Sequence, residues 1–221
     1  TGFNRVLMKQ INNTEVDYYH ENVESAVCAR IPYEDIDKEM VAYTKAHAQK
    51  HGWIWSVPLQ SRMGSGYVYT TNSCTKEEAE ADFRKYWGNR LDGVEVTHLT
   101  FNSSPLKKAW KNNVVAIGLS GGFIEPLEAT GISWIITSAN LLCDVISRCG
   151  YGESNRELYN ATIRNYIEDV QDYVDVHYKL SARRDSKLWE YHTVRGHHPR
   201  LMNKLELYRK QMPTRWNRPQ I

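Results

Sequence analysis

The chain has 221 residues, 41% hydrophobic and 24% charged, which is ordinary for a globular protein with a sizeable core. Its 28 basic and 26 acidic residues leave a net charge of +2, which gives no support to a dedicated nucleic-acid or membrane surface. No apolar run approaches the roughly 18 residues that a membrane span needs. The four cysteines form no C-x-x-C pair and no metal-ligand spacing. We therefore expect a cytoplasmic protein with reduced, partly buried thiols and no metal site.

The first hundred residues predict mainly strands, because β-prone and alternating runs are separated by turn residues. The expected elements are a short helix or turn over 1–11, a strand over 23–32, a loop with helical turns over 34–50, a strand over 53–58, a turn at 62–66 and its hairpin partner over 67–71. Thr75 followed by Glu78 is typical of a helix N-cap, and this helix should continue to about Trp87. A further strand is expected over 94–101.

The second half predicts mainly helices. An apolar stripe at helical spacing predicts a core-facing helix, formed by Ile132, Ile135, Ile136, Ala139, Leu142, Cys143 and Ile146. A second long helix is expected over roughly 154–178, short helices over 187–192 and 201–208, and an irregular tail from Met212. Strands and a hairpin followed by long helices predict an α+β fold, and no linker clearly divides it.

The stretch Gly118–Ile132, GLSGGFIEPLEATGI, gives the strongest signal for a ligand site. Its glycines allow positive φ and a close approach of the backbone to a ligand. Thr130 and Gly131 fall where the following helix should begin, so their N–H groups would suit a small anion. Glu128 lies just ahead of that anion site. A surface loop whose acids favour the helix dipole is the simpler alternative for Glu125 and Glu128.

This stretch resembles the flavin-contacting segment of the flavin-dependent halogenases, the family that includes the tryptophan halogenases. Two further segments carry the same resemblance. Gly52–Gln60, GWIWSVPLQ, is similar to the family's G-W-x-W-x-I-P motif, with Val57 in the isoleucine position. Arg183–Ser186 with Trp189 is similar to the family's late R-D-[DS]-x-x-W segment. The segments occur in the family's order and together cover most of residues 1–195, so chance is a poor explanation.

The resemblance implies the C-terminal part of a FAD-dependent halogenase or monooxygenase-like fold over residues 1–221. The flavin-contacting segment would be 114–132, and a helical, substrate-side part would occupy about 132–221. The implied activity is halogenation of an electron-rich aromatic, such as an indole or phenol, with FADH2, oxygen and chloride, bromide or iodide. The implied partners are a separate flavin reductase, the N-terminal half of the same protein and a second copy in a homodimer.

The family's site residues carry over position by position. Glu128 would be the catalytic carboxylate, which stabilises the cation that builds on the aromatic ring and then takes its proton. Thr130 and Gly131 would bind the halide through their N–H groups. The family commonly has serine at the position of Ala129, so any role of that hydroxyl is lost here. The implied cofactor-binding residues are Gly118, Leu119, Ser120, Gly121, Gly122, Phe123, Ile124 and Pro126.

Trp53, Trp55 and Pro58 would be gating and structural residues. Taken alone, two tryptophans on one face of a strand are more often core than cofactor wall. In the family, this motif is taken to keep the organic substrate away from the flavin, so that hypohalous acid diffuses to it along a tunnel. A later group favours a packing and ion-pair cluster, with a role at the border of the substrate space as the alternative: His177, Tyr178, Arg184, Asp185 and Trp189.

The chain opens on Thr1-Gly2-Phe3, and in the family a T-G-F run closes the main nucleotide-binding part. No segment matches the dinucleotide fingerprint G-x-G-x-x-G, and the family's tunnel lysine also belongs to the N-terminal half. We therefore expect a C-terminal half that is inactive alone, with a short C-terminal region that leaves an open site. Two alternatives are a monooxygenase-like hydroxylase, against which Trp53 and Trp55 argue, and a non-catalytic binding or assembly piece.

Overall fold

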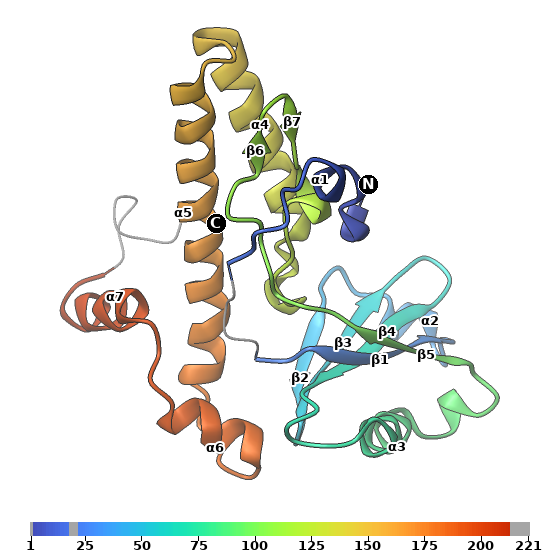
Figure 1. Ribbon diagram of the computed structural model, residues 1–221. Helices are drawn as coiled ribbons and strands as arrows, with labels where there is room; N and C mark the ends of the chain where they lie inside the picture. The colour runs from blue at the N-terminus through green and yellow to red at the C-terminus, as the bar shows by residue number, and fades with distance from the viewer. Residues whose placement is uncertain (1, 18–21, 213–221) are drawn as a thin grey trace. The chain divides into compact units, whose positions relative to one another are not determined.

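The computed structural model describes residues 2–17 and 22–212, so most of the expected irregular tail lies outside the described residues. The chain forms two compact units (Figure 1). The sheet unit comprises Asn22–Phe101 and Leu180–Arg195, and the helical unit comprises Thr1–Glu21, Asn102–Lys179 and Gly196–Ile221. An antiparallel sheet together with long helices confirms the α+β class.

The sheet unit is built on a five-stranded sheet with the order β2-β3-β4-β1-β5, in which every neighbouring pair is antiparallel. The strands are β1 Ser25–Ile31, β2 Lys45–Ala48, β3 Gly52–Pro58, β4 Met63–Tyr69 and β5 Val96–Thr100. The helices are α2 Ile36–Glu39, α3 Lys76–Trp87, η2 Gly88–Leu91 and α6 Lys187–Val194. The expected strands over 23–32, 53–58 and 94–101 are confirmed, and so is the β3–β4 hairpin.

Two details of this sheet differ from the sequence-based expectation. The turn predicted at 62–66 is wrong, because the hairpin closes at Leu59, whose N–H donates to the carbonyl of Arg62, and β4 already begins at Met63. Glycines in the strand caused the error, since glycine is also the commonest turn residue. The loop predicted over 34–50 contains strand β2, whose residues are all exposed and therefore show no buried apolar alternation.

Helix α3 covers one face of the sheet (Figure 1). It begins at a capping box, in which the Thr75 hydroxyl accepts from the N–H of Glu78 and the Glu78 carboxylate accepts from the N–H of Thr75. This confirms the predicted helix start. The core between helix and sheet is formed by Val27, Ala29, Ile31, Ile54, Met63, Tyr67, Tyr69, Cys74, Ala79, Phe83 and Leu91.

The helical unit is organised around two long helices that lie side by side, α4 Gly131–Cys149 and α5 Glu153–Lys179 (Figure 1). The remaining elements are η1 Gly2–Asn4, α1 Val6–Gln10, β6 Trp110–Lys111, β7 Val114–Val115, η3 Gly118–Ser120, η4 Leu127–Ala129 and α7 Pro199–Lys210. The predicted long helices are confirmed. Helix α5 contributes more buried apolar side chains than any other element of this unit, namely Tyr159, Ile163, Tyr166, Ile167, Val170, Val174 and Tyr178.

The apolar stripe of α4 does not face the core of the helical unit, so this part of the prediction is wrong. Ile132, Ile135 and Ile136 are 71%, 45% and 55% exposed. The helix instead buries Trp134, and the Tyr159 hydroxyl of α5 donates to the carbonyl of Ser138. Periodicity identifies an apolar helix face but not the element that covers it, and α5 packs against a different face of α4.

Residues Leu127–Cys149 are long and apolar enough to span a membrane by length and composition alone. The sequence-based expectation was that no segment is long and apolar enough to span a membrane. The segment was overlooked because it includes Asp144, Arg148 and several small polar residues, yet its mean hydropathy is 1.4 over the best window. Core helices of soluble proteins meet the same criterion, so one such helix is weak evidence for a membrane protein.

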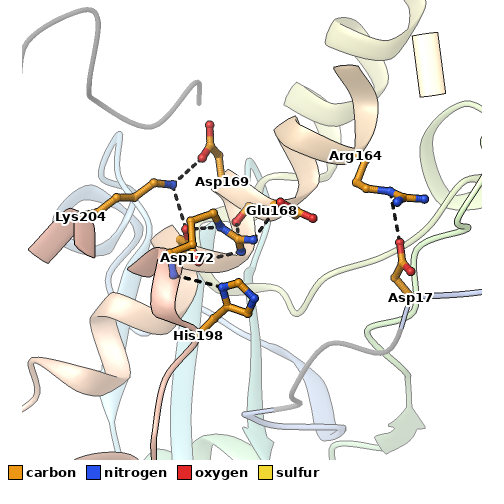
Figure 2. Close-up of polar contacts among 8 residues, drawn as sticks. Asp17, Arg164, Glu168, Asp169, Asp172, His198 and Lys204 are labelled. Carbon is orange, nitrogen blue, oxygen red and sulfur yellow. Dashed lines mark hydrogen bonds and ion pairs between the residues drawn. The ribbon is translucent and has the colours of Figure 1, made fainter. Parts of the chain in front are cut away.

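An ionic cluster fastens α7 to α5, as Figure 2 shows. The carboxylate of Asp172 is 3% exposed and accepts two hydrogen bonds from Arg200, at 2.7 and 2.9 Å, and one from Lys204 at 2.8 Å. Arg200 also donates to Glu168 at 2.8 Å, and Lys204 to Asp169 at 2.5 Å. Burial acts to lower the pKa of Lys204, but its hydrogen bonds to Asp169 and Asp172 raise that pKa above its ordinary value.

All four cysteines are free thiols. Cys74 is buried, Cys28 is half-buried, and Cys143 and Cys149 are exposed. Burial raises the pKa of Cys28 to about 11 and that of Cys74 to about 12, so these two thiols stay protonated near neutral pH. Within residues 2–17 and 22–212, no group of three or more His, Cys, Asp or Glu side chains could hold a metal ion.

Candidate functional site

The glycine-rich loop ahead of α4 folds back on its own unit. Gly118 has a φ of +62°, and a Cβ there would lie 2.7 Å from a side-chain carbon of Ile135. A Cβ on Gly122 would lie 2.6 Å from the Cα of Pro105. Both positions therefore require glycine for packing within the chain. A role for the glycines in approaching a ligand stays a prediction.

The predicted cofactor-binding residues lie on η3 and in the loop that follows it. Leu119 is 43% exposed and is the most accessible of them. Ser120 donates its hydroxyl to the carbonyl of Ile117 at 2.9 Å. The half-buried members are Ser120, Phe123 and Pro126, and the buried members are Gly118, Gly121, Gly122 and Ile124.

Glu128 stands in a strained backbone conformation directly before α4. Its φ is 66° and its ψ is 5°, and Ala129 follows with a φ of 50°. The left-handed region is uncommon for residues other than glycine, and holding one there costs on the order of 1–3 kcal/mol. Such strain is concentrated at functional sites, so the conformation supports a functional role for the Glu128 side chain.

Two side chains of α5 contact the Glu128 carboxylate. His177 Nε2 lies 3.1 Å from Oε1, and the Tyr173 hydroxyl donates to Oε2 at 3.3 Å. Burial raises the pKa of Tyr173, and the charge of Glu128 and the hydrogen bond to it raise that pKa further. The phenol therefore remains a hydrogen-bond donor. The Glu128 side chain is 38% exposed, so the carboxylate is held by its neighbours and remains accessible.

The second glutamate of the loop has a structural position. Glu125 is 2% exposed and accepts a hydrogen bond of 2.5 Å from the hydroxyl of Tyr178, which is also buried. Side chains of α5 therefore contact both glutamates of the loop. Tyr173 and His177 contact Glu128, and Tyr178 contacts Glu125. His177 and Tyr178 were expected in a later packing cluster, and Tyr173 was not predicted as a site residue. The sequence signal for Tyr173 and His177 was their spacing of four residues, which places both side chains on the same face of a helix.

The start of α4 has the geometry of an anion site. The backbone changes from left-handed at Ala129 to right-handed at Thr130, an arrangement in which successive N–H groups converge on a concave surface. Thr130 is the N-cap of α4 without a side-chain cap, and no heavy atom lies within 4 Å of a Cβ built on Gly131. Among the described residues, neither N–H donates to a backbone carbonyl of another element; Gly131 is exposed, whereas Thr130 is 8% exposed. The N–H of Gly131 at the start of α4 is therefore the more accessible of the two to a small anion.

An exposed apolar strip adjoins this anion site. It is formed by Leu119 of η3 and by Ile132, Ile135 and Ile136 of α4, all of them more than 40% exposed. The side chain of Ile135 lies against Gly118, which joins the two elements. Exposed apolar side chains of this kind can pack against a flat apolar ring system. The residues present are therefore compatible with contact to a flavin ring.

In the sheet unit, Trp53 and Trp55 lie on the face of the sheet opposite α3. Their ring centroids are 6.2 Å apart. Trp53 is 6% exposed and Trp55 is half-buried. Trp55 faces Gly66 across the β3–β4 pair, and Pro58 ends β3 opposite Met63. The structure places Trp53, Trp55 and Pro58 on one strand, with the indole rings of Trp53 and Trp55 on one face of the sheet.

The Trp55 ring occupies space that only a glycine leaves open. A Cβ on Gly66 would lie 2.1 Å from the Trp55 ring, whereas a Cβ on Gly64 meets nothing closer than 3.6 Å. We expect Gly66→Ala to displace the ring and to destabilise the chain by about 1–3 kcal/mol, the cost of overpacking. Gly64→Ala is the matched control on the same strand and face, and it should cost nothing. Denaturant unfolding and near-ultraviolet circular dichroism measure the two effects. Equal behaviour of the variants would contradict the assigned ring position.

The segment Arg183–Ser186 with Trp189, the third one that resembles the family, forms ion-pair and packing contacts within the sheet unit. Arg183 forms a two-pronged ion pair with Asp185 at 2.9 and 2.6 Å, donates to the carbonyl of Ala48 and lies over the ring of Trp189. The indole N–H of Trp189 donates to the carbonyl of Gln49. The hydrogen bonds from Arg183 lower the pKa of Asp185. The predicted packing and ion-pair cluster is thus present only in part: Asp185 and Trp189 form it with Arg183 in place of Arg184, whereas His177 and Tyr178 contact the glutamates of the loop instead.

Comparison with known proteins agrees with this picture. A family model described as tryptophan halogenase matches residues 1–219. The chain is 34% identical to tryptophan 6-halogenase SttH of Streptomyces toxytricini and 32% identical to 7-chloro-L-tryptophan 6-halogenase KtzR of Kutzneria sp. (strain 744). Each match covers 96% of this chain, and 41% and 42% of those proteins respectively.

Solved structures give the same result. The crystal structure of SttH superposes with a TM-score of 0.88 over 94% of this chain and 41% of that one. Xcc4156, a flavin-dependent halogenase from Xanthomonas campestris, superposes with a TM-score of 0.88 at 25% identity, over 99% of this chain and 44% of that one. The chain thus spans about two fifths of the length of the relatives that it matches. By sequence and by fold, it belongs to the tryptophan halogenase family.

Proposed function

We propose that this chain is the substrate-side, C-terminal part of a flavin-dependent halogenase that acts on an electron-rich aromatic, such as an indole or phenol. The observation that carries the proposal is the accessible Glu128 carboxylate, which is held in a left-handed turn directly ahead of an anion-ready helix start. Membership of the tryptophan halogenase family supports the same reaction.

In this proposal, one group of residues binds the halide and another acts on the aromatic substrate. The N–H groups of Thr130 and Gly131 hold chloride, bromide or iodide. Glu128 faces the aromatic substrate, stabilises the positive charge that develops on the ring, and accepts the ring proton as the carbon–halogen bond forms. FADH2 with oxygen, when bound, supplies the oxidation that makes the halogen electrophilic.

The flavin would be held by the loop from Gly118 to Pro126 together with the exposed apolar strip. Trp53, Trp55 and Pro58 would gate the flavin, in keeping with the resemblance of their strand. The N-terminal half of the protein would supply the rest of the flavin site and the tunnel lysine. A separate flavin reductase would deliver reduced flavin in the cytoplasm, and the enzyme would act as a monomer or a homodimer.

Mass spectrometry of products tests this proposal. The chain joined to its N-terminal half is incubated with a flavin reductase, NADH, a panel of indoles and phenols, and each halide in turn. We expect halide-dependent mass increases of one halogen for hydrogen. Oxygen incorporation without halide would favour the monooxygenase-like hydroxylase, and absence of any turnover would favour the binding or assembly piece. Strict selectivity for free tryptophan would contradict the expected open site.

A further inference from the structure

His177 makes two contacts that together fix the protons on its ring. Its Nδ1 lies 2.8 Å from the backbone carbonyl oxygen of Tyr173, one turn earlier on α5. A carbonyl oxygen can only accept, so Nδ1 carries a hydrogen. The other ring nitrogen, Nε2, lies 3.1 Å from Glu128 Oε1. The backbone of α5 thus determines which nitrogen His177 presents to Glu128.

A carboxylate opposite Nε2 also accepts, so a bond between these two atoms requires a hydrogen on Nε2 as well. With both nitrogens protonated, the ring would direct Nδ1–H to the α5 backbone and Nε2–H to Glu128. Hydrogen bonds between two charged partners are about twice as strong as neutral ones. The Tyr173 ring stands edge-to-face against the His177 ring, with centroids 5.0 Å apart, and limits its rotation.

We propose that His177 is a positioning residue for the reaction, and that with Tyr173 it clamps both oxygens of the Glu128 carboxylate in one orientation toward the aromatic substrate. The assignment rests on the proposed function of Glu128. Both donors come from one long helix, so they are held rigidly relative to each other. Without them, a half-exposed glutamate would sample several rotamers, and misplacement of a catalytic group by about 1 Å can cost on the order of a hundredfold in rate.

Variants of His177 in the chain joined to its N-terminal half test this role. His177→Phe keeps a planar ring and removes both donors. We expect it to lower the kcat of halogenation at least tenfold, with the KM for the aromatic within about twofold, because ground-state binding is not affected. His177→Gln can place an N–H near the position of Nε2 and should retain most of the activity. Tyr173→Phe removes only a long hydrogen bond and should lose less activity than His177→Phe.

Nitrogen-15 NMR of this chain gives a readout that does not depend on turnover. We expect the Nδ1 signal of His177 to be that of a nitrogen that carries a hydrogen, and the Nε2 signal to move in Glu128→Gln, because Nε2 is the atom that contacts Glu128. Unfolding midpoints close to that of the unmodified chain show that the variants remain folded.

The outcomes separate the two proposals. Unchanged kcat in His177→Phe, equal losses in His177→Phe and His177→Gln, or a His177 signal insensitive to Glu128→Gln would each overturn the positioning role. Full halogenation by Glu128→Gln would instead remove the proposed function of Glu128. In that case, a shift of the His177 signal in the same variant would still show that the two side chains are paired.

Discussion

Replacing Glu128 by glutamine in the chain joined to its N-terminal half should lower the rate of halogenation about 100-fold or more, the usual contribution of a positioned proton acceptor. Flavin oxidation should continue at a near-normal rate, because it does not need this carboxylate. Glutamine matches glutamate in size and can accept from the Tyr173 hydroxyl, but it has neither negative charge nor basicity. Product formation by mass spectrometry and oxygen consumption, measured in one reaction, separate the two steps.

The matched control is Glu157→Gln, which neutralises an exposed carboxylate on α5 and should leave both rates unchanged. Glutamine meets the same backbone strain as glutamate at position 128, so the unfolding midpoint should also stay constant. Halogenation by Glu128→Gln at the rate of the unmodified protein would show that the assignment of Glu128 is wrong. Loss of flavin oxidation together with halogenation would indicate a defect in cofactor binding instead.

Replacing Arg200 by alanine should destabilise the chain by about 3 kcal/mol, the lower end of the cost of leaving a buried charge with its pair broken. Asp172 is 3% exposed and would lose two of its hydrogen bonds, and Glu168 would lose its partner (Figure 2). Because Lys204 stays in contact with Asp172, the carboxylate keeps one partner, and we expect the loss of stability to lie at the lower end of the range for a broken buried ion pair. Denaturant unfolding of this chain measures the change in the free energy of unfolding.

Arg209 offers a control on the same helix. Its contact with Glu206 is 3.5 Å long, and the two side chains are 78% and 53% exposed. Exposed ion pairs contribute less than about 1 kcal/mol, so Arg209→Ala should change stability little. Equal effects of the two substitutions would contradict the structural role of the cluster. A double-mutant cycle with Asp172→Asn should give a coupling energy of at least about 1 kcal/mol, because the two side chains are in direct contact.

The sequence was sufficient for elements with a strong local signal. Thr75 and Glu78 marked the start of α3, because a capping box depends on residues three positions apart. The long helices followed from periodicity. Strand β2 was missed because all its residues are exposed, and the β3–β4 turn was misplaced because Gly64 and Gly66 lie within a strand. In the case of Gly66, the reason is the ring of Trp55 on the neighbouring strand, which no local pattern reveals.

By itself, the sequence determined the α+β class, the resemblance to the halogenases and the candidate residues Glu128, Thr130 and Gly131, because each depends on neighbouring residues. The tertiary structure alone decided what holds the Glu128 carboxylate. Tyr173 and His177 are more than forty residues away along the chain and reach Glu128 only because α5 packs beside α4. It also decided that the apolar stripe of α4 is exposed in the helical unit, since the face that a helix buries depends on its neighbours and not on its own periodicity.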